Sequence, residues 1–367
     1  MTHREIIFYA PFGKGIPIES IGGGEAGCLK TKAIYEKDGI VVHRLDKPAI
    51  SAGKLQYFLG LMVIPFKLVV LMLKYPHAPV HITGFYWKIA GYEWMLLKLC
   101  MLFGHKTIYE LRNGTMVQSY KEGNARYRKT LKKLLLKPDV VLCQGQEYVD
   151  FIKEMWGVER SYYPNYIMDE YVGSNNTDRP HPIKLIFFGR LVAPKRIDII
   201  IDTLVLLRHA GYDATLDLIG GYNDDYKDEL DKQIANAGVA PYVTFHGRQR
   251  FDFIAQKLKS SHYFVFPSEN RQEGHSNSLT EAMGCGVVPI VSPAGFNTSI
   301  CGDAELVIEQ MEAVRYAEKI IQIERAGKWE HYSNQVFQRV KTMYTSQVVG
   351  EKLLSYINPL LPHPAKA

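Results

Sequence analysis

The sequence lacks the features that mark a disulfide-stapled, zinc-binding or exported protein. Its 367 residues include five cysteines, which form no Cys-x-x-Cys pair and have no histidine at ligand spacing. This pattern argues against a disulfide framework or a zinc site, and it favours a reducing, cytoplasmic setting. The first expected strand, residues 6–10, is preceded by no apolar segment with a cleavage site, so we expect no secretory signal.

An uninterrupted run of about twenty apolar residues, the length that crosses a bilayer, is also missing. The most hydrophobic stretch, residues 55–73, is interrupted by Gln56, Gly60, Pro65 and Lys67. A lysine beside a proline is rare near the centre of a membrane span, and proline breaks helices. We therefore expect a pair of helices here, buried in the domain in preference to lying at a membrane interface.

The formal net charge of +6 is mild, and the excess of Lys and Arg falls in the first half of the chain, residues 1–178. Within it, residues 120–137 predict a basic amphipathic helix. One interpretation is a solvated helix with its leucines in the core. The other is a surface that docks peripherally on an anionic membrane, where each Lys or Arg contributes about 1 kcal/mol. No helix-turn-helix, zinc-finger or RNP-like context supports nucleic-acid binding.

The strongest functional pattern lies near the end of the chain, in residues 263–291. It predicts a buried strand at 263–266, a polar loop, a helix from about Asn277 and a second buried strand at 287–291. Glu273 in the loop and Glu281 in the helix can face one ligand. Between them, backbone N–H groups at the helix N-terminus would favour an anion.

A carboxylate beside an anion site is not expected to bind the anion, because like charges repel. It is expected to accept hydrogen bonds from a neutral group, and sugar hydroxyls are the best candidates. The alternative is that Glu273 and Glu281 lie on a solvated loop and helix surface.

This stretch resembles the signature of the retaining glycosyltransferases of family 4. The resemblance rests on a Pro-Ser pair before Glu273 and on the run Glu-Ala-Met-Gly-Cys-Gly-Val-Val-Pro that begins at Glu281. It implies that Glu273 holds hydroxyls of the donor sugar, that Glu281 holds the nucleotide ribose and that the loop amides take the diphosphate. Many relatives carry Gly-Phe after the first glutamate, whereas this chain has Gly274 and His275, so the polarity of the pocket is expected to differ.

The resemblance also implies the fold, an α/β GT-B fold with two Rossmann-like domains facing across a cleft and a C-terminal helix that crosses back to the first domain. The second domain restarts with a strand at 184–189, and Arg190 and Lys195 after it match the family's second half of the phosphate site. Such cations stabilise a departing nucleoside diphosphate, so we expect no metal. Asp224-Asp225 lacks the Asp-x-Asp form of metal-dependent sugar transferases.

The glycine-rich loop after the first strand contains Gly22-Gly23-Gly24-Glu25. It resembles the Gly-Gly-Ala-Glu segment that faces the donor phosphates and the acceptor in family 4. Without that resemblance, a flexible turn explains such a loop equally well.

Two positions in the first domain are candidates for the acceptor side. Several relatives place a histidine where Arg112 or its neighbour Asn113 stands. An arginine there can hold an acidic acceptor or a phosphate, or it can pair with a carboxylate. His81 at the end of a strand is a second candidate, with a structural role as the alternative.

The composition, 47% hydrophobic and 22% charged, is that of a globular protein, and the length suits two domains. We expect an acceptor-binding domain over residues 1–170, a nucleotide-sugar-binding domain over 171–344, and a returning helix and tail over 345–367. The expected function is a retaining glycosyltransferase without a cofactor, located in the cytoplasm and peripherally on the inner face of the cell membrane. It would move a hexosyl unit from a UDP-sugar, with a GDP-sugar second, to a glycan or lipid-linked glycan of surface polysaccharide or lipopolysaccharide synthesis. The alternatives are a GT-B nucleotide-sugar epimerase and an inactive sugar-nucleotide-binding module.

The catalytic candidates are Glu273, Arg190 and Lys195. The donor-binding candidates are Gly22, Gly23, Gly24, Gly189, Arg190, Lys195, Gly221, Arg248, Gly274, His275, Ser276, Asn277, Ser278 and Glu281. The acceptor-side candidates are Glu25, His81, Arg112 and Asn113.

Overall fold

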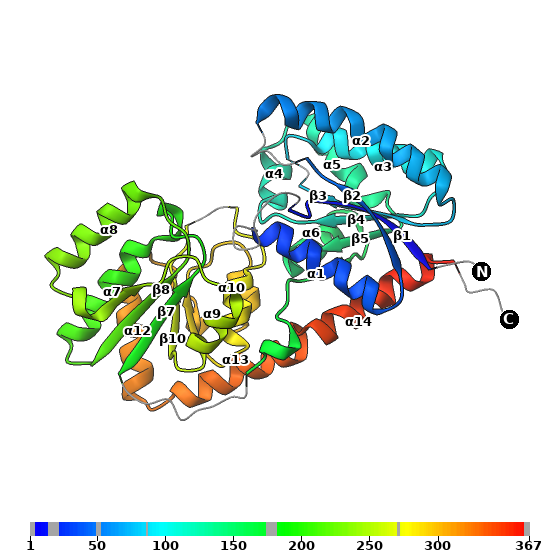
Figure 1. Ribbon diagram of the computed structural model, residues 1–367. Coiled ribbons are helices and arrows are strands. Elements are labelled where there is room, and N and C mark those ends of the chain that lie inside the picture. The colour runs from blue at the N-terminus through cyan, green and yellow to red at the C-terminus, as the bar shows by residue number, and fades with distance from the viewer. Residues whose placement is uncertain are drawn as a thin grey trace. The chain divides into compact units, whose positions relative to one another are not determined.

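The computed structural model of the protein describes residues 4–13, 22–48, 53–85, 87–173, 182–269 and 272–362 (Figure 1). The chain divides into two compact units: unit 1 comprises Met1–Pro164 with Val349–Ala367, and unit 2 comprises Asn165–Val348. Most of the predicted glycine-rich loop and the end of the predicted tail lie outside the described residues.

Unit 1 is built on a six-stranded parallel sheet with the order β2-β1-β3-β4-β5-β6. Since β1 lies between β2 and β3, the strands are added on one side of β1 and then on the other, as in a doubly wound fold. The strands are β1 (Glu5–Ala10), β2 (Val41–Asp46), β3 (Val80–Gly84), β4 (Thr107–Leu111), β5 (Val140–Cys143) and β6 (Ser161–Tyr162).

Helices cover both faces of this sheet (Figure 1). They are α1 (Gly23–Lys37), α2 (Lys54–Lys74), α3 (Ala90–Leu102), α4 (Met116–Glu122), α5 (Ala125–Leu136) and α6 (Gln146–Trp156). The last helix, α14 (Ser346–Ile357), ends in unit 1, where Gly350 lies against Ile34 of α1. The C-terminal helix therefore returns to the first unit, as predicted.

The hydrophobic stretch predicted as a buried helix pair is a single helix, α2, and most of its apolar side chains are exposed. Pro65 lies inside the helix and has no N–H to donate to the carbonyl oxygen of Leu61, four residues earlier. The hydroxyl of Tyr92 in α3 donates to that oxygen instead, at 2.8 Å. The prediction was wrong because a side chain 31 residues away replaces the donor that proline lacks.

The predicted basic helix over residues 120–137 is divided into α4 and α5 at Gly123. Asn124 caps α5, because its side-chain oxygen accepts a hydrogen bond from the backbone N–H of Tyr127 at 2.8 Å. Three leucines of α5 are buried, namely Leu131, Leu134 and Leu135. Most of the Lys and Arg side chains of this helix are exposed. The leucine face therefore packs into the core, which was the first of the two interpretations.

Unit 2 is built on a five-stranded parallel sheet with the order β11-β10-β7-β8-β9. Its strands are β7 (Ile183–Phe188), β8 (Ala214–Ile219), β9 (Val243–Phe245), β10 (Tyr263–Phe266) and β11 (Val288–Val291). Its helices are α7 (Ile197–His209), α8 (Asp224–Asn236), α9 (Phe251–Leu258), α10 (Asn277–Met283), α11 (Asn297–Cys301), α12 (Ala313–Arg325) and α13 (Trp329–Met343). Short 3-10 turns occur at Asp169–Tyr171, Ala193–Lys195, Ala240–Tyr242, Ala304–Leu306 and Asn358–Leu360, the last of them in unit 1.

The central strands of unit 2 are buried on both faces. All four residues of β10 are fully buried, and Phe264 stacks on Phe187 of β7 with ring centroids 5.9 Å apart. Continuous apolar strands of this kind are expected in a parallel sheet, because helices cover both of its faces. This rigid core fixes the loops that leave the strands.

Candidate functional site

The candidate site of unit 2 lies at one edge of the sheet. Since all five strands are parallel, the loops that follow them emerge at the same carboxyl edge. The neighbours β7 and β10 form the point where the strand order reverses, and ligands of open α/β sheets bind at such points. Arg190 and Lys195 follow β7, and Glu273 follows β10.

The loops after β7 and β8 are joined by glycine turns. Gly220 has a φ of 151°, and a Cβ at this position would lie 1.6 Å from the carbonyl oxygen of Gly189. The backbone N–H of Gly189 donates to Ile219, and that of Leu191 donates to Gly221, both at 2.9 Å. Only glycine fits at position 220, and the first residues of the β7 loop are held in place.

Lys195 and Glu273, which were predicted to bind different parts of the donor, form an ion pair with each other. Their side chains are only 12% and 13% exposed, so the pair is shielded from most of the solvent. The ammonium group also lies 4.7 Å from the centroid of the Phe266 ring. The pair joins the loop after β7 to the loop after β10 at the point where the strand order reverses.

Arg190 differs from Lys195 in its surroundings. Its side chain is exposed, and within the described ranges it makes no hydrogen bond or ion pair. It is a cation at the carboxyl edge of the sheet that remains available to an anionic ligand.

The loop that carries Glu273 is held closely from the β11 side. Gly295, in the loop after β11, has a φ of 59°, and a Cβ there would lie 2.1 Å from the backbone oxygen of Glu273. Ser268 lies 3.4 Å from the Glu273 carboxylate. The position of this carboxylate is thus set by two loops and by Lys195.

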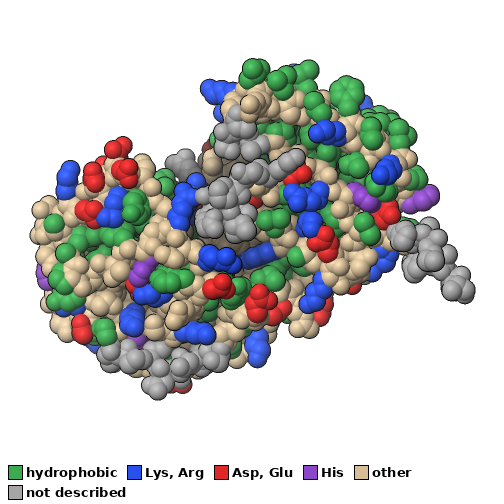
Figure 2. Space-filling model, in the orientation of Figure 1, with side chains coloured by type: hydrophobic (Ala, Val, Ile, Leu, Met, Phe, Trp, Pro, Cys, Tyr) green, Lys and Arg blue, Asp and Glu red, His purple; other side chains and the backbone are tan. Residues whose placement is uncertain are grey.

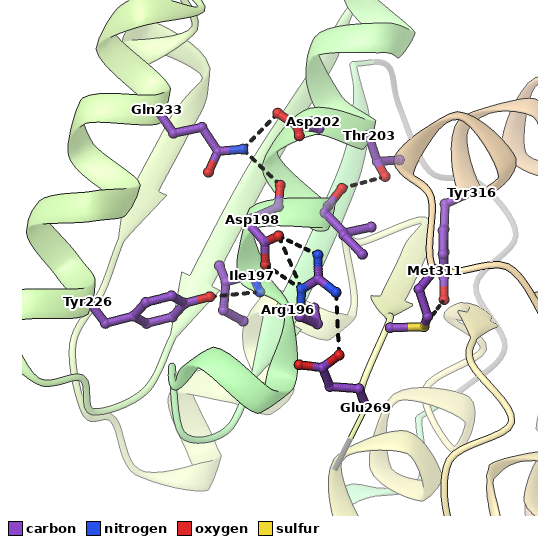
Figure 3. Close-up of polar contacts among 11 residues, drawn as sticks. Arg196, Ile197, Asp198, Asp202, Thr203, Tyr226, Gln233, Glu269, Met311 and Tyr316 are labelled. Carbon is purple, nitrogen blue, oxygen red and sulfur yellow. Dashed lines mark hydrogen bonds and ion pairs between the residues drawn. The ribbon is translucent and has the colours of Figure 1, made fainter.

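Arg196, the residue after Lys195, is a positioning residue that sequence reasoning missed (Figure 3). Among the described residues it is the only non-glycine with a positive φ, 52°. Its guanidinium donates to Asp198 at 2.8 and 3.1 Å and lies 3.4 Å from Glu269, whose backbone N–H donates to Pro194 at 3.0 Å. The hydrogen bond to Asp198 raises the pKa of Arg196. These contacts tie the loop after β10 to the turn that presents Lys195.

The residues after Glu273 are arranged less simply than the sequence predicts. The ring of His275 is buried and packs edge-on against Tyr344, with centroids 5.0 Å apart, so it points into the protein. Asn165 donates to the backbone oxygen of His275 at 2.7 Å. The histidine at this position, where many family 4 enzymes carry phenylalanine, is therefore accommodated by packing in the interior.

The N-terminus of α10 is capped by the side chain of Ser276. The hydroxyl of Ser276 accepts a hydrogen bond from the N–H of Leu279 at 3.3 Å and lies 3.2 Å from the hydroxyl of Ser278. The side-chain oxygen of Asn277 is buried and finds no donor in the described part of the chain. Glu281 lies in the second turn of the same helix, half-buried. Gly274, between Glu273 and His275, is half-buried in the loop.

The loop after β9 brings a third cation to this edge. The N–H of Gly220 donates to Gly247 at 2.8 Å, and a Cβ on Gly221 would lie 2.4 Å from Nε of Arg248. Arg248 therefore lies directly over Gly221, and its side chain is exposed. The structure thus brings Arg190, Lys195, Gly221, Arg248 and Glu273 to one edge of the unit 2 sheet.

In unit 1, the acceptor candidates His81 and Arg112 belong to one buried network around Glu110. His81 Nε2 lies 3.3 Å from one oxygen of Glu110, and Arg112 Nη2 lies 2.6 Å from the other. The hydroxyl of Tyr35 lies 2.9 Å from His81 Nδ1, and that of Thr83 donates to Glu110 at 2.9 Å. Burial by itself would raise the pKa of Glu110, but the charge of Arg112 and the hydrogen bonds from its partners lower it to about 2.

Arg112 is further enclosed by α1. It is 6% exposed, and a Cβ on Gly27 would lie 1.9 Å from its Nη1 atom. Since His81 is fully buried as well, the geometry favours the alternative left open for both residues, a structural role. One signal in the sequence could have predicted the pairing of Arg112 with Glu110. Residues two apart in an extended segment point to the same face, as these two do.

The other unit 1 candidates lie at the beginnings of helices. Gly23 and Gly24 start α1, Gly22 precedes it, and Glu25 is in its first turn. Gly22 and Gly23 are exposed. The side chain of Asn113 accepts hydrogen bonds at 3.0 Å from the N–H and hydroxyl of Thr115 at the start of α4, so Asn113 has a local structural role.

A family model described as "Glycosyl transferases group 1" matches residues 174–336, which lie within unit 2. A search of curated proteins found no match. In the described residues no group of three or more His, Cys, Asp or Glu side chains is arranged to hold a metal ion.

Solved structures match nearly the whole chain at low identity. Sucrose-phosphate synthase from Thermosynechococcus elongatus has a TM-score of 0.76 and 16% identity, and the match covers 97% of this chain and 99% of that one. HepE from Anabaena, solved in complex with UDP, has a TM-score of 0.73 and 16% identity, with 97% and 100% covered. A glycosyltransferase from Rickettsia africae has a TM-score of 0.71 and 13% identity, with 98% and 99% covered. The predicted GT-B fold is confirmed.

Proposed function

We propose that the chain is a glycosyltransferase that transfers a hexosyl unit from a UDP-sugar, with retention of configuration, to a hydroxyl of a glycan or lipid-linked glycan. The proposal is supported by the match of a group 1 glycosyltransferase model to residues 174–336 and by the GT-B fold. The observation that carries this proposal is the Lys195–Glu273 ion pair at the point where the strand order of unit 2 reverses. The pair places a cation that can bind a phosphate beside a carboxylate that can accept hydrogen bonds from sugar hydroxyls.

The proposed roles follow from charge. A departing nucleoside diphosphate gains negative charge, and Arg190 and Lys195 would stabilise it where that charge develops. Glu273, released from Lys195, would accept hydrogen bonds from hydroxyls of the sugar, and Glu281 would hold the ribose. By resemblance to family 4, the acceptor hydroxyl attacks from the side of the leaving group and passes its proton to the leaving phosphate, so no carboxylate base is needed.

Two observations support UDP as the nucleotide and a metal-free site. The HepE structures, which this chain resembles in fold, were solved with UDP and with UDP-glucose. Three cations, Arg190, Lys195 and Arg248, lie at the same edge of the unit 2 sheet, and preorganised cations stabilise a diphosphate without a divalent ion. A GDP-sugar is the second choice.

We further propose that the acceptor belongs to surface polysaccharide or lipopolysaccharide synthesis and that the enzyme works in the cytoplasm, peripherally on the inner face of the membrane. The support is the cationic first half of the chain and the exposed apolar surface of α2 in unit 1.

The first test is the thermal midpoint of the protein with UDP, GDP, ADP, CMP or NAD, each in EDTA. A nucleotide at 100 times its dissociation constant adds about 2.7 kcal/mol to the free energy of unfolding. We expect a shift with UDP, and a smaller one or none with the others. A shift that appears only when a divalent ion replaces EDTA would contradict the metal-free site.

A pair of arginine variants then tests the site itself. Arg190→Ala should lower UDP affinity and transfer, because it removes an available cation from the carboxyl edge. Arg325→Ala is the matched control, because this arginine is also exposed but is the last residue of α12. Four residues later in the sequence, the indole N–H of Trp329 donates to the backbone oxygen of His262, just before β10 begins. Equal loss in both variants would contradict the assignment.

Measurement of UDP-sugar consumption with and without an acceptor separates the alternative reactions. A transferase consumes the UDP-sugar only when an acceptor is present, apart from slow hydrolysis. An epimerase would convert the sugar without an acceptor, and an inactive module would bind UDP-sugar and convert nothing.

A further inference from the structure

One surface of unit 1 has no place in the proposed chemistry, and it is formed by the outward side of α2. Eight apolar side chains of this helix are between 45% and 76% exposed: Leu55, Phe58, Leu59, Met62, Val63, Phe66, Val70 and Leu73. We refer to these eight residues as the α2 apolar face. Figure 2 shows hydrophobic side chains along the edge of unit 1 that α2 occupies in Figure 1. Exposed apolar patches of this extent mark an interaction surface.

The opposite side of α2 fastens the helix along the domain. Leu61, Ile64, Leu68 and Met72 recur at three- and four-residue intervals and are buried, and the Tyr92 hydroxyl donates to Leu61. The helix has 21 residues and would be long enough, at about 1.5 Å per residue, to cross a bilayer. Crossing would require pulling four buried side chains out of unit 1. The helix is therefore held so that one side only can meet an apolar phase.

Polar side chains mark one border of the α2 apolar face. Gln56, Lys67 and Lys74 are exposed and separated by eleven and seven residues, intervals that return to nearly the same side of a helix. The helix contains no Asp or Glu. Lysines at the border of an apolar helix face can extend their ammonium groups to the level of lipid phosphates.

These charges select among the possible partners. In a symmetric dimer through this face, the same surface patch of each copy would meet its counterpart, and α2 has no acidic residue to pair with the lysines. An anionic lipid surface offers both an apolar layer for the eight side chains and negative charge for the lysines.

We propose that the α2 apolar face docks on an anionic membrane leaflet, with the helix axis in the plane of the membrane and the eight side chains in the interfacial layer. This deepens the proposed function, since a lipid-linked acceptor would be met at that surface. It places the membrane contact on α2, whereas the second interpretation of residues 120–137 placed it on the basic helix.

The test is flotation of the full chain with phosphatidylcholine vesicles that contain or lack phosphatidylglycerol. Burial of one phenylalanine side chain corresponds to about a tenfold or greater change in partitioning, so the double variant Phe58→Ala/Phe66→Ala should bind anionic vesicles about a hundredfold less tightly. Both side chains are more than 60% exposed, so this variant should fold normally. Met62→Ala and Met155→Ala form a matched pair, because Met155 is an exposed methionine on α6, and only the first should weaken binding.

The charge is tested separately with Lys67→Gln/Lys74→Gln. About 1 kcal/mol for each lysine corresponds to roughly fivefold weaker binding per residue, on anionic vesicles only and at low salt. Unchanged vesicle binding in the phenylalanine double variant would overturn the proposal. Equal binding to neutral and anionic vesicles would also overturn it, as would a change from dimer to monomer in that variant without loss of vesicle binding. The UDP-induced thermal shift of the same variants reports on the proposed function independently, since it needs no vesicles.

Discussion

Glu273→Gln is the most informative perturbation of the unit 2 site, because it removes one charge of the Lys195–Glu273 pair and changes little of the side chain's shape. Both side chains are about seven-eighths buried. Without the carboxylate, the Lys195 ammonium stays largely out of water with no counter-charge from Glu273. Fully buried pairs cost about 3–5 kcal/mol when one partner is removed, and partial exposure reduces this, so we expect a loss of about 1–3 kcal/mol in the free energy of unfolding.

The affinity of the variant for UDP is expected to change in the opposite direction and to increase. The diphosphate would supply the counter-charge that the variant lacks and would no longer compete with Glu273 for Lys195. If about 1.4 kcal/mol of the attraction becomes available to the phosphate, UDP binds about tenfold more tightly. Sugar transfer should fall at the same time, because the group that orients the sugar hydroxyls is lost.

Thermal unfolding of wild type and variant, with and without UDP in EDTA, measures both effects. Glu159→Gln is the matched control: Glu159 pairs with Lys153 at 2.6 Å, but the two side chains are 75% and 61% exposed. It should change neither the midpoint nor the UDP shift. A UDP shift in Glu273→Gln that is equal to or smaller than that of the wild type would refute the assignment of Lys195 to the diphosphate.

Three further predictions concern the scaffold. Tyr92→Phe removes the hydroxyl that donates to the backbone oxygen of Leu61, so we expect a loss of about 1–2 kcal/mol in the free energy of unfolding. Pro65→Ala should cancel most of this loss, because alanine supplies a backbone N–H, and a double-mutant cycle measured by urea unfolding tests this. Glu110→Gln should flatten the acid limb of the stability profile: the depressed pKa of Glu110 contributes stability above its usual value of 4.5, and this is lost as the pH falls toward about 2. Gly220→Ala should cost more than about 2 kcal/mol in thermal unfolding, because it combines backbone strain with a steric clash.

Each of these has an outcome that contradicts it. Tyr92→Phe should cost little in a Pro65→Ala background, so an equal cost in both backgrounds would show that the hydroxyl does not replace the missing N–H. An acid limb as steep in Glu110→Gln as in the wild type would show that another group dominates it. Gly238→Ala is the control for Gly220→Ala, because Gly238 has a φ of 66° but open space around the position of a Cβ. Equal losses of stability in the two variants would show that backbone strain alone, and not the steric clash, accounts for the effect at position 220.

The sequence predicted the helices and strands around the candidate site of unit 2 well, because the signals for these elements are local. The strand at 263–266, the helix from Asn277 and the strand after Gly286 depend on short apolar runs and on glycine stops, and β10, α10 and β11 agree with them within a residue or two. The carboxyl-edge placement of Arg190 and Glu273 follows from the parallel sheet. The direct pairing of Lys195 with Glu273, 78 residues away, has no local signal.

Long-range contacts also explain the errors in unit 1. The helix break predicted at Pro65 depended on the assumption that no donor replaces the missing N–H, and Tyr92 provides one. The outward-facing apolar side of α2 was missed because a stretch that is apolar on all sides is normally buried. Part of the network around Glu110 could have been predicted from the sequence, because Glu110 and Arg112 are two residues apart in an extended segment. The contact of His81 with Glu110 could not, because it depends on the pairing of β3 with β4.

The Lys195–Glu273 pair has a consequence for discrimination in a cell rich in phosphate and in free nucleotides. A cation and a carboxylate that satisfy each other present little net charge to a small anion, and the same pair offers little to a neutral sugar. Under the proposed function, a ligand that brings a diphosphate and sugar hydroxyls together can separate the two partners and satisfy both at once. The site would then act as a coincidence detector, in which the intact donor is preferred over either of its halves.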